Sequence, residues 1–157
     1  MRKTKQNEKI RSTSLRDFIA EGVRQAYHGE DIPCVPTSLR ILGQLFDIEI
    51  SGDVYTACWG LNGAGLYGAQ CGLVEGALMI LSMLCHRYKM DTDGISRVCS
   101  NFASDFEDRF GSLLCRELRP EGFTNDQPPH LCEERTVAAI VFAAEFIEDV
   151  FKIKPSF

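Results

Sequence analysis

The sequence has no Cys-x-x-Cys pair among its seven cysteines. Close pairs of this kind mark zinc ribbons and thioredoxin-type redox motifs, so neither can be read directly from the chain. The Cys-x-x-Cys-His motif is also missing, and we therefore expect no covalent haem. Any site that these cysteines share must be assembled from segments that lie far apart in the sequence.

Long apolar runs are missing too. Only Ile10 interrupts the polar residues before Leu15, so the apolar core of a secretory signal is lacking. The most apolar stretch, LVEGALMILSMLC, contains Glu75 and falls short of the ~20 residues that cross a bilayer. We expect no membrane insertion and a cytoplasmic location, where numerous cysteines indicate metal or redox chemistry rather than structural disulfides.

Positive charge is scarce outside the first residues. The formal net charge is -5, although residues 1–11 hold five basic side chains against a single glutamate. An acidic body argues against nucleic acid as a partner. We predict a disordered basic tail over residues 1–12 and one four-cysteine domain over residues 13–157.

Helical periodicity dominates the chain, and no convincing alternation of period two is found. The pattern predicts an all-α, single-domain bundle of about five to six helices, with a glycine-rich loop before a central helix. Ser14 is the expected cap of the first helix, and a loop is expected over residues 119–130. The final helix is apolar on nearly every side, which predicts a central place for it as well. The expected helices cover residues 14–28, 35–47, 51–59, 70–87, 94–110 and 131–152, with a short helical turn over 112–118.

The glycine-rich stretch GAGLYGAQCGLVEGA covers residues 63–77 and surrounds Cys71. Gly68, Gly72 and Gly76 recur every four residues, so on a helix they would form a bare stripe that a backbone or a ligand could approach closely. A phosphate or dinucleotide cradle is disfavoured, because the loop lacks Gly-Lys-Ser/Thr and no strand precedes it.

The cysteines differ in their expected positions. Cys85 and Cys99 fall within apolar helix faces, where cysteine commonly packs as a small hydrophobe, and the role of Cys58 stays open. The other four lie near predicted helix starts or in a tight turn, where free N–H groups favour the thiolate and are expected to lower its pKa. These four are Cys34, Cys71, Cys115 and Cys132.

Three segments carry a resemblance to a known family. They are GLYGAQCGLVEGALMIL, FEDRFGSLLCREL and LCEERTVAAIVFAAEFI. They resemble the small redox-active proteins named for their C, GCAxxG, C, C cysteine signature, which are related to the four-cysteine domain of split-Soret cytochromes. Cys34 matches the first cysteine of the signature, although PCVPTSLRIL departs from the usual C-A-x-x-V pattern.

The resemblance implies that Cys34, Cys71, Cys115 and Cys132 form one redox site. Four thiolates match the ligand count of a [2Fe-2S] or [4Fe-4S] cluster, our first choice, with electron transfer to a redox protein partner as the first role. The glycines, Gly68 and Gly72 among them, would let backbone N–H groups approach a cluster closely.

Other interpretations of the same residues remain open. Four cysteines also suit a structural zinc ion, and metal-free thiol–disulfide chemistry would make Cys71 the attacking nucleophile, so whether the protein is an enzyme is undecided. His130 is a possible alternative ligand, though a loop histidine is usually exposed. Trp59 and Tyr67 could shield the site, although core packing is the default for both. Two chains could share the site in a homodimer.

Overall fold

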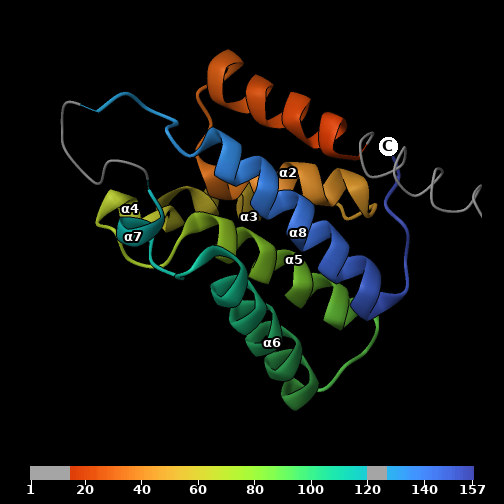
Figure 1. The fold of residues 1–157 in the computed structure, drawn as a ribbon. Coiled ribbons are helices and arrows are strands. Elements are labelled where there is room, and N and C mark those ends of the chain that lie inside the picture. Colours follow the sequence, from red (N-terminus) through yellow and green to blue (C-terminus); the bar gives the residue numbers. More distant parts are fainter. Residues whose placement is uncertain (1–14, 120–126) are drawn as a thin grey trace, which may run out of the picture.

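The computed structural model describes residues 15–119 and 127–157. The predicted tail over residues 1–12, the expected cap Ser14 and most of the predicted loop over 119–130 lie outside this range. Figure 1 shows helices packed against one another, with the C-terminus beside the bundle.

The described residues form helices and no strand, which confirms the all-α fold. None of the described helices combines the length and apolarity that a membrane crossing requires. A helix over residues 15–24 continues into the π-helical turn η1. The elements in chain order are η1 (Gln25–Gly29), α2 (Cys34–Leu45), α3 (Gly52–Ala57), η2 (Cys58–Leu61), α4 (Gly63–Leu66), α5 (Gly72–Arg87), α6 (Thr92–Phe110), α7 (Cys115–Leu118) and α8 (Glu133–Phe151).

Local signals explain where several helices begin and end. The Ser51 side chain accepts a hydrogen bond from the backbone N–H of Val54 and caps α3. Asp91 caps α6 in the same way through the N–H of Gly94. Gly111 ends α6 in the left-handed conformation at φ 92°, which glycine adopts without a steric penalty.

Helix α5 is the centre of the bundle. It packs against α2, α6 and α8, and Leu81 and Leu84 on its surface are fully buried. Burial of a leucine side chain contributes about 2 kcal/mol. Gly76 lets α2 come close, because a Cβ there would lie 2.7 Å from the Cβ of Ser38. The predicted glycine stripe is therefore used for helix packing at this position.

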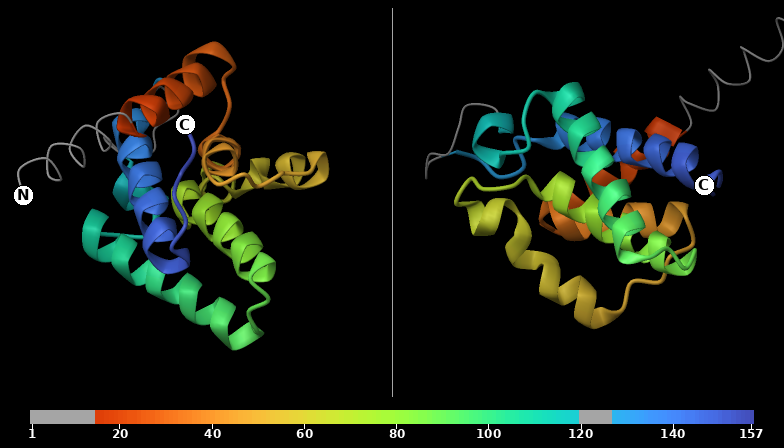
Figure 2. Two further views of the ribbon diagram at one scale, coloured as in Figure 1. Left: turned by 90° about the vertical axis from the view of Figure 1, so that its right-hand side faces the viewer. Right: turned by 90° about the horizontal axis from the view of Figure 1, so that it is seen from below.

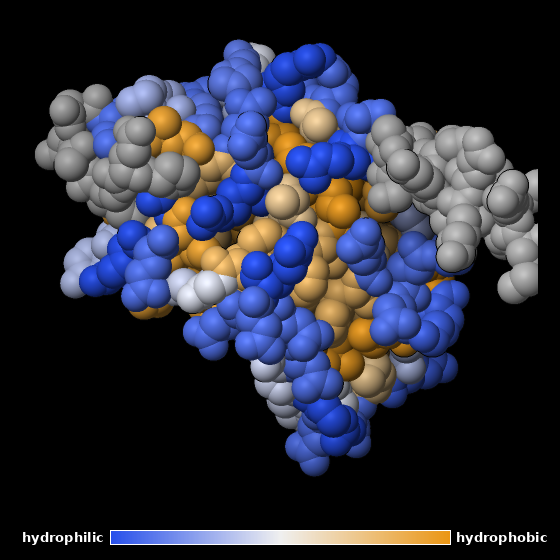
Figure 3. All heavy atoms as spheres, in the orientation of Figure 1, coloured by the Kyte–Doolittle hydropathy of each residue, from blue (hydrophilic) through white to orange (hydrophobic). Residues whose placement is uncertain are grey.

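Two details of the predicted bundle are wrong. Helix α5 begins at Gly72, so Gly68 lies in the preceding loop and not on the helical stripe. Helix α8 is not central, because it lies along one side of the bundle with Phe142 and Phe146 only half-buried. Figure 3 shows an apolar band on this face, between α8 and α6. An apolar segment can thus cover a core from outside and keep part of its own apolar surface in contact with water.

The segment that leads to the glycine loop lies at the outside of the bundle. Both views in Figure 2 show α3 projecting from the other helices, and α3 buries none of its residues. Helices η2 and α4 continue from α3 and contact each other. The chain then enters the loop and turns back into α5, so the loop lies at one end of the central helix.

Candidate functional site

Four helix starts each carry one cysteine. Cys34 is the first residue of α2 and Cys115 the first residue of α7, while Cys71 caps α5 and Cys132 caps α8. The sequence predicted helix starts at Cys34, Cys71 and Cys132, and the structure confirms all three. It adds Cys115, for which the sequence predicted only a tight turn. Four separate segments therefore present their cysteines in the same local setting.

Two of these starts are joined by backbone hydrogen bonds. The N–H of Cys71 donates to the carbonyl of Leu113 at 2.8 Å, and the N–H of Cys115 donates to the carbonyl of Ala69 at 2.7 Å. These bonds flank an isolated antiparallel bridge between Gln70 and Leu114. Because the bonds run in both directions, they fix Cys71 and Cys115 relative to each other.

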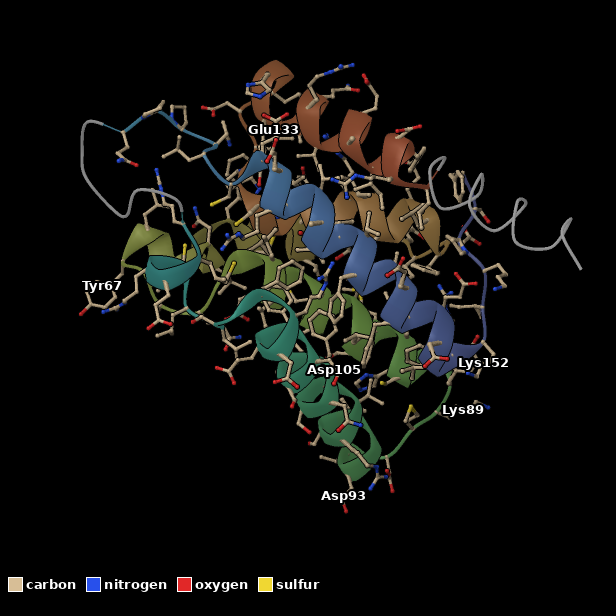
Figure 4. All side chains as sticks on the ribbon, viewed as in Figure 1. Tyr67, Lys89, Asp93, Asp105, Glu133 and Lys152 are labelled. Atoms are coloured by element: carbon tan, nitrogen blue, oxygen red, sulfur yellow. The ribbon has the colours of Figure 1, made fainter. Side chains whose placement is uncertain are left out.

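The structure brings all four thiols within electrostatic reach of one another. Burial, and then the charges of the other three thiolates, raise the pKa of Cys34. The pKa of Cys71 rises through burial and through Cys115 and Cys132, and that of Cys115 through burial and Cys132. Every pair among the four therefore interacts. Figure 4 shows sulfur atoms gathered between α7 and the beginning of α8.

The predicted lowering of the thiol pKa values is wrong. Burial raises the pKa of Cys71 from 9.0 to about 11, although the backbone N–H groups of Leu73 and Val74 act in the opposite direction. Burial likewise raises the pKa of Cys132. A helix start lowers the pKa of a thiol when water or a nearby cation also stabilises the thiolate. Here the loss of water raises the pKa by more than the helix dipole lowers it.

A cavity of about 610 Å³ opens beside the cysteines. Cys34, Cys115 and Cys132 line it, whereas Cys71 is buried outside its lining. A volume of this size falls in the range of small-molecule and cofactor sites. Its other lining residues combine apolar with polar side chains and are Tyr27, Asp31, Pro33, Asn62, Leu66, Arg119, Gln127, Pro129, His130 and Leu131.

The side chains do not yet have the positions of metal ligands. Over residues 15–119 and 127–157, no three His, Cys, Asp or Glu side chains stand close enough together to hold a metal ion. The seven cysteines are all free thiols, so none of them is tied into a disulfide. Ligation would require the thiols to turn toward a common point.

Glycines leave room directly beside two of the thiols. A Cβ at Gly72 would lie 2.3 Å from the Sγ of Cys34, a distance that excludes any side chain at this position. Gly63, which the sequence did not single out as a site residue, has a φ of +64° and lies against Cys115, whose Sγ would be 3.1 Å from an added Cβ. Gly68 instead packs against Arg116, so its close contact is with the chain and not with a thiol.

Tyr27 and His130 form a second layer around the cysteines. Their rings stack with centroids 4.3 Å apart, and the hydroxyl of Tyr27 lies 2.8 Å from the hydroxyl of Thr136. Burial, followed by the charge of Cys34, raises the pKa of Tyr27. His130 is largely buried, with 13% of its side chain exposed, and its Nε2 lies 2.6 Å from Asp31. An exposed loop position for His130 is therefore wrong, and Tyr27 carried no signal in the sequence.

The remaining cysteines lie apart from this group. Cys58 is buried and its thiol donates to the carbonyl of Tyr55, and burial raises its pKa. Cys85 is fully buried in α5 and lies near Cys99 of α6, whose charge adds to the burial that raises the Cys85 pKa. Cys85 and Cys99 thus pack between two helices, as the sequence predicts.

The two aromatic residues beside the loop do not belong to the core. Tyr67 is 76% exposed and points away from the bundle at its edge, and Trp59 is 44% exposed. The side chain of Arg116 lies over the Tyr67 ring at 5.5 Å and donates to the carbonyl of Gly68 at 2.9 Å. Core packing, the default prediction for both aromatic residues, is therefore wrong.

Comparison with known proteins gives one result. A family model described as "Putative redox-active protein (C_GCAxxG_C_C)" matches residues 34–146. The chain belongs to this family. The match begins at Cys34 and includes the other three cysteines of the site, which agrees with the resemblance seen in the sequence. Searches of curated proteins and of solved structures gave no match.

Proposed function

We propose that Cys34, Cys71, Cys115 and Cys132 form one redox centre, and that this centre holds an iron–sulfur cluster for electron transfer. One observation carries the proposal: four separate helix starts bring their thiols close enough for an electrostatic interaction within every pair. Membership in a redox-active family supports the same role. Packing alone would not require four cysteines at helix starts, three of them lining one cavity.

The residues present fit an iron–sulfur cluster in number and chemistry. Four cysteine thiolates are the common ligand set of [2Fe-2S] and [4Fe-4S] clusters. Gly72 and Gly63 leave the space beside Cys34 and Cys115 free of side chains, so backbone N–H groups can come near the cluster sulfides. When bound, the cluster would supply a site that accepts and releases single electrons.

The protein surroundings would serve this centre in two ways. The bridge at Gln70 and Leu114 holds Cys71 and Cys115 at a set separation, which restricts the movement of two ligands. Burial excludes water from Cys71, and the absence of water strengthens the effect of nearby charges on the centre. Electrons would leave toward a redox protein partner.

Metal-free thiol chemistry is a weaker candidate. It would require Cys71 to attack a disulfide as a thiolate. With a pKa of about 11, the Cys71 thiol is almost entirely protonated at neutral pH. A bound metal removes this difficulty, because its positive charge stabilises the deprotonated thiol.

A structural zinc ion is the other candidate. The same four cysteine donors satisfy the tetrahedral preference of zinc. The cavity of about 610 Å³ favours the larger iron–sulfur cluster, since a closed zinc site needs no adjoining space.

Metal analysis with visible spectroscopy tests the proposal. The protein is purified and reconstituted with iron and sulfide under anaerobic conditions. We expect a brown protein with iron and acid-labile sulfide in equal amounts, and an absorption band that dithionite bleaches. A colourless protein with one zinc per chain would support structural zinc, and a metal-free protein with a reducible disulfide would support thiol chemistry. Either result contradicts the cluster.

A further inference from the structure

Arg119 brings a positively charged side chain to the lining of the cavity. It follows Cys115 by four residues, and its backbone N–H donates to the Cys115 carbonyl at 2.9 Å. This bond closes the single turn of α7, and Arg119 follows the turn in an extended conformation. Arg119 also lines the cavity together with Cys34, Cys115 and Cys132.

The charge of Arg119 acts on two of the thiols. It opposes the rise in pKa that burial causes at Cys115, and it does the same at Cys132. Arg135 adds to this effect at Cys132 alone and does not line the cavity. Independently of these shifts, Arg119 supplies the guanidinium in the lining of the cavity that Cys34, Cys115 and Cys132 share.

A cation at this place would act on the charge that reduction adds to the centre. Reduction of an iron–sulfur cluster by one electron adds one negative charge to it. Reduction of a disulfide by two electrons breaks the S–S bond, and because burial raises the pKa values of these thiols, two protons are taken up at neutral pH and no net charge is added. A nearby positive charge therefore stabilises the reduced form of a cluster, most strongly where water is excluded.

We infer that the positive charge of Arg119 sets the reduction potential of the four-cysteine centre by stabilising its reduced form. The inference rests on the proposed redox function. It assigns to Arg119 a role in the energetics of electron transfer and no part in holding the cofactor.

Redox titration of substituted proteins tests this role. Arg119→Gln removes the charge, Arg119→Lys keeps it, and Arg97→Gln removes an equal charge from an exposed position on α6. Each protein is titrated anaerobically against a dithionite-reduced mediator series, followed by visible absorption for a cluster, or against dithiothreitol with thiol counting for a disulfide.

We expect Arg119→Gln to shift the redox equilibrium of the cluster about tenfold toward the oxidised form, which is about 59 mV lower for its one-electron couple. Arg119→Lys should lower the potential by less than half as much as Arg119→Gln does. Arg97→Gln should leave the potential unchanged. If Arg119→Gln does not fold, Arg119→Met keeps the apolar stem without the charge and is expected to show the same shift.

Three results would differ from the expected one. A normal redox couple in Arg119→Gln or Arg119→Met, with the same potential as in Arg97→Gln, overturns the role of Arg119 and leaves the proposed function intact. Absence of any redox couple in the unmodified protein contradicts the proposed function itself, and the role of Arg119 with it. An equal fall in Arg119→Lys and Arg119→Gln would show that charge is not the cause.

Discussion

Each end of α5 holds one cysteine, and the two cysteines have different neighbours. Cys71 at the N-terminal end is 6% exposed and Cys85 near the C-terminal end is 0% exposed, and burial raises the pKa of both. Cys71 interacts with three other thiols at helix starts, whereas Cys85 lies near Cys99 alone. Burial therefore does not distinguish these two cysteines, whereas the groups around them do.

The largest expected effect separates these two positions directly. Cys71→Ala removes one of four ligands and should lower the bound iron by on the order of tenfold or more. Cys85→Ala, on the same helix and equally buried, should keep its iron. Iron and sulfide analysis of both reconstituted variants, with circular dichroism as a check on folding, measures the difference. Equal iron in the two variants would contradict a ligand role for Cys71.

The two glycines of α5 sharpen the comparison further. Alanine at Gly72 or Gly76 would overlap α2, with contacts of 2.3 Å to the Cys34 Sγ and 2.7 Å to the Ser38 Cβ respectively. Overpacking should cost about 1–3 kcal/mol of unfolding free energy in each, measured by urea denaturation. Only Gly72→Ala should also lose iron, because only this substitution displaces a thiol. Loss of iron in both variants would mean that iron binding depends on the packing of α5 against α2 and not on the position of the Cys34 thiol.

Alkaline pH should act on the end of α5 that holds Cys71. The pKa of the Cys71 thiol rises from 9.0 to about 11 in the folded, metal-free protein. The folded state therefore holds this proton more tightly than the unfolded state does. This stabilisation is complete below pH 9 and is lost as the pH rises from 9 to 11, by on the order of 2 kcal/mol. Urea denaturation of reduced, metal-free protein over this range should show the loss.

Cys71→Ala supplies the control for this titration. Lysines and tyrosines also titrate above pH 9, so the informative quantity is the difference between the parent protein and the variant. A smaller loss of stability in Cys71→Ala is expected. Identical pH profiles would show that Cys71 titrates alike in both states.

The smallest effect concerns packing at the other end of α5. Cys85→Ala should lower the unfolding free energy by about 1 kcal/mol, because it leaves a small cavity among buried side chains. Cys99→Ala, which removes a half-buried side chain, should cost less. Neither variant should change the redox potential. A changed potential in Cys85→Ala would extend the redox site along the whole helix.

The features that could be predicted from the sequence are local. Helix starts at Cys34, Cys71 and Cys132 follow from prolines, glycines and apolar periodicity within a few residues, and these signals act before the chain is folded. The four-cysteine motif was visible for the same reason. A spacing of four residues places Gly68 on one stripe with Gly72 and gives no sign that Gly68 lies in the loop before α5.

The features that could not be predicted depend on packing between distant segments. Burial raises the thiol pKa values, and nothing near Cys71 in the sequence shows how many side chains will cover it. Tyr27 reaches the site only because its helix lies beside the start of α8, where its hydroxyl meets Thr136. Arg119 stands four residues after Cys115, but only the folded chain shows that it shares a cavity lining with Cys34 and Cys132.

Native mass spectrometry of the anaerobically reconstituted protein tests whether one cluster depends on all four cysteines. A single four-cysteine centre predicts a chain whose mass is increased by one complete iron–sulfur cluster, and a chain without this increase when any one of Cys34, Cys71, Cys115 or Cys132 is replaced by alanine. A cluster that persists after one of these replacements, or a reconstituted parent protein with only its own mass, would contradict a single four-cysteine centre.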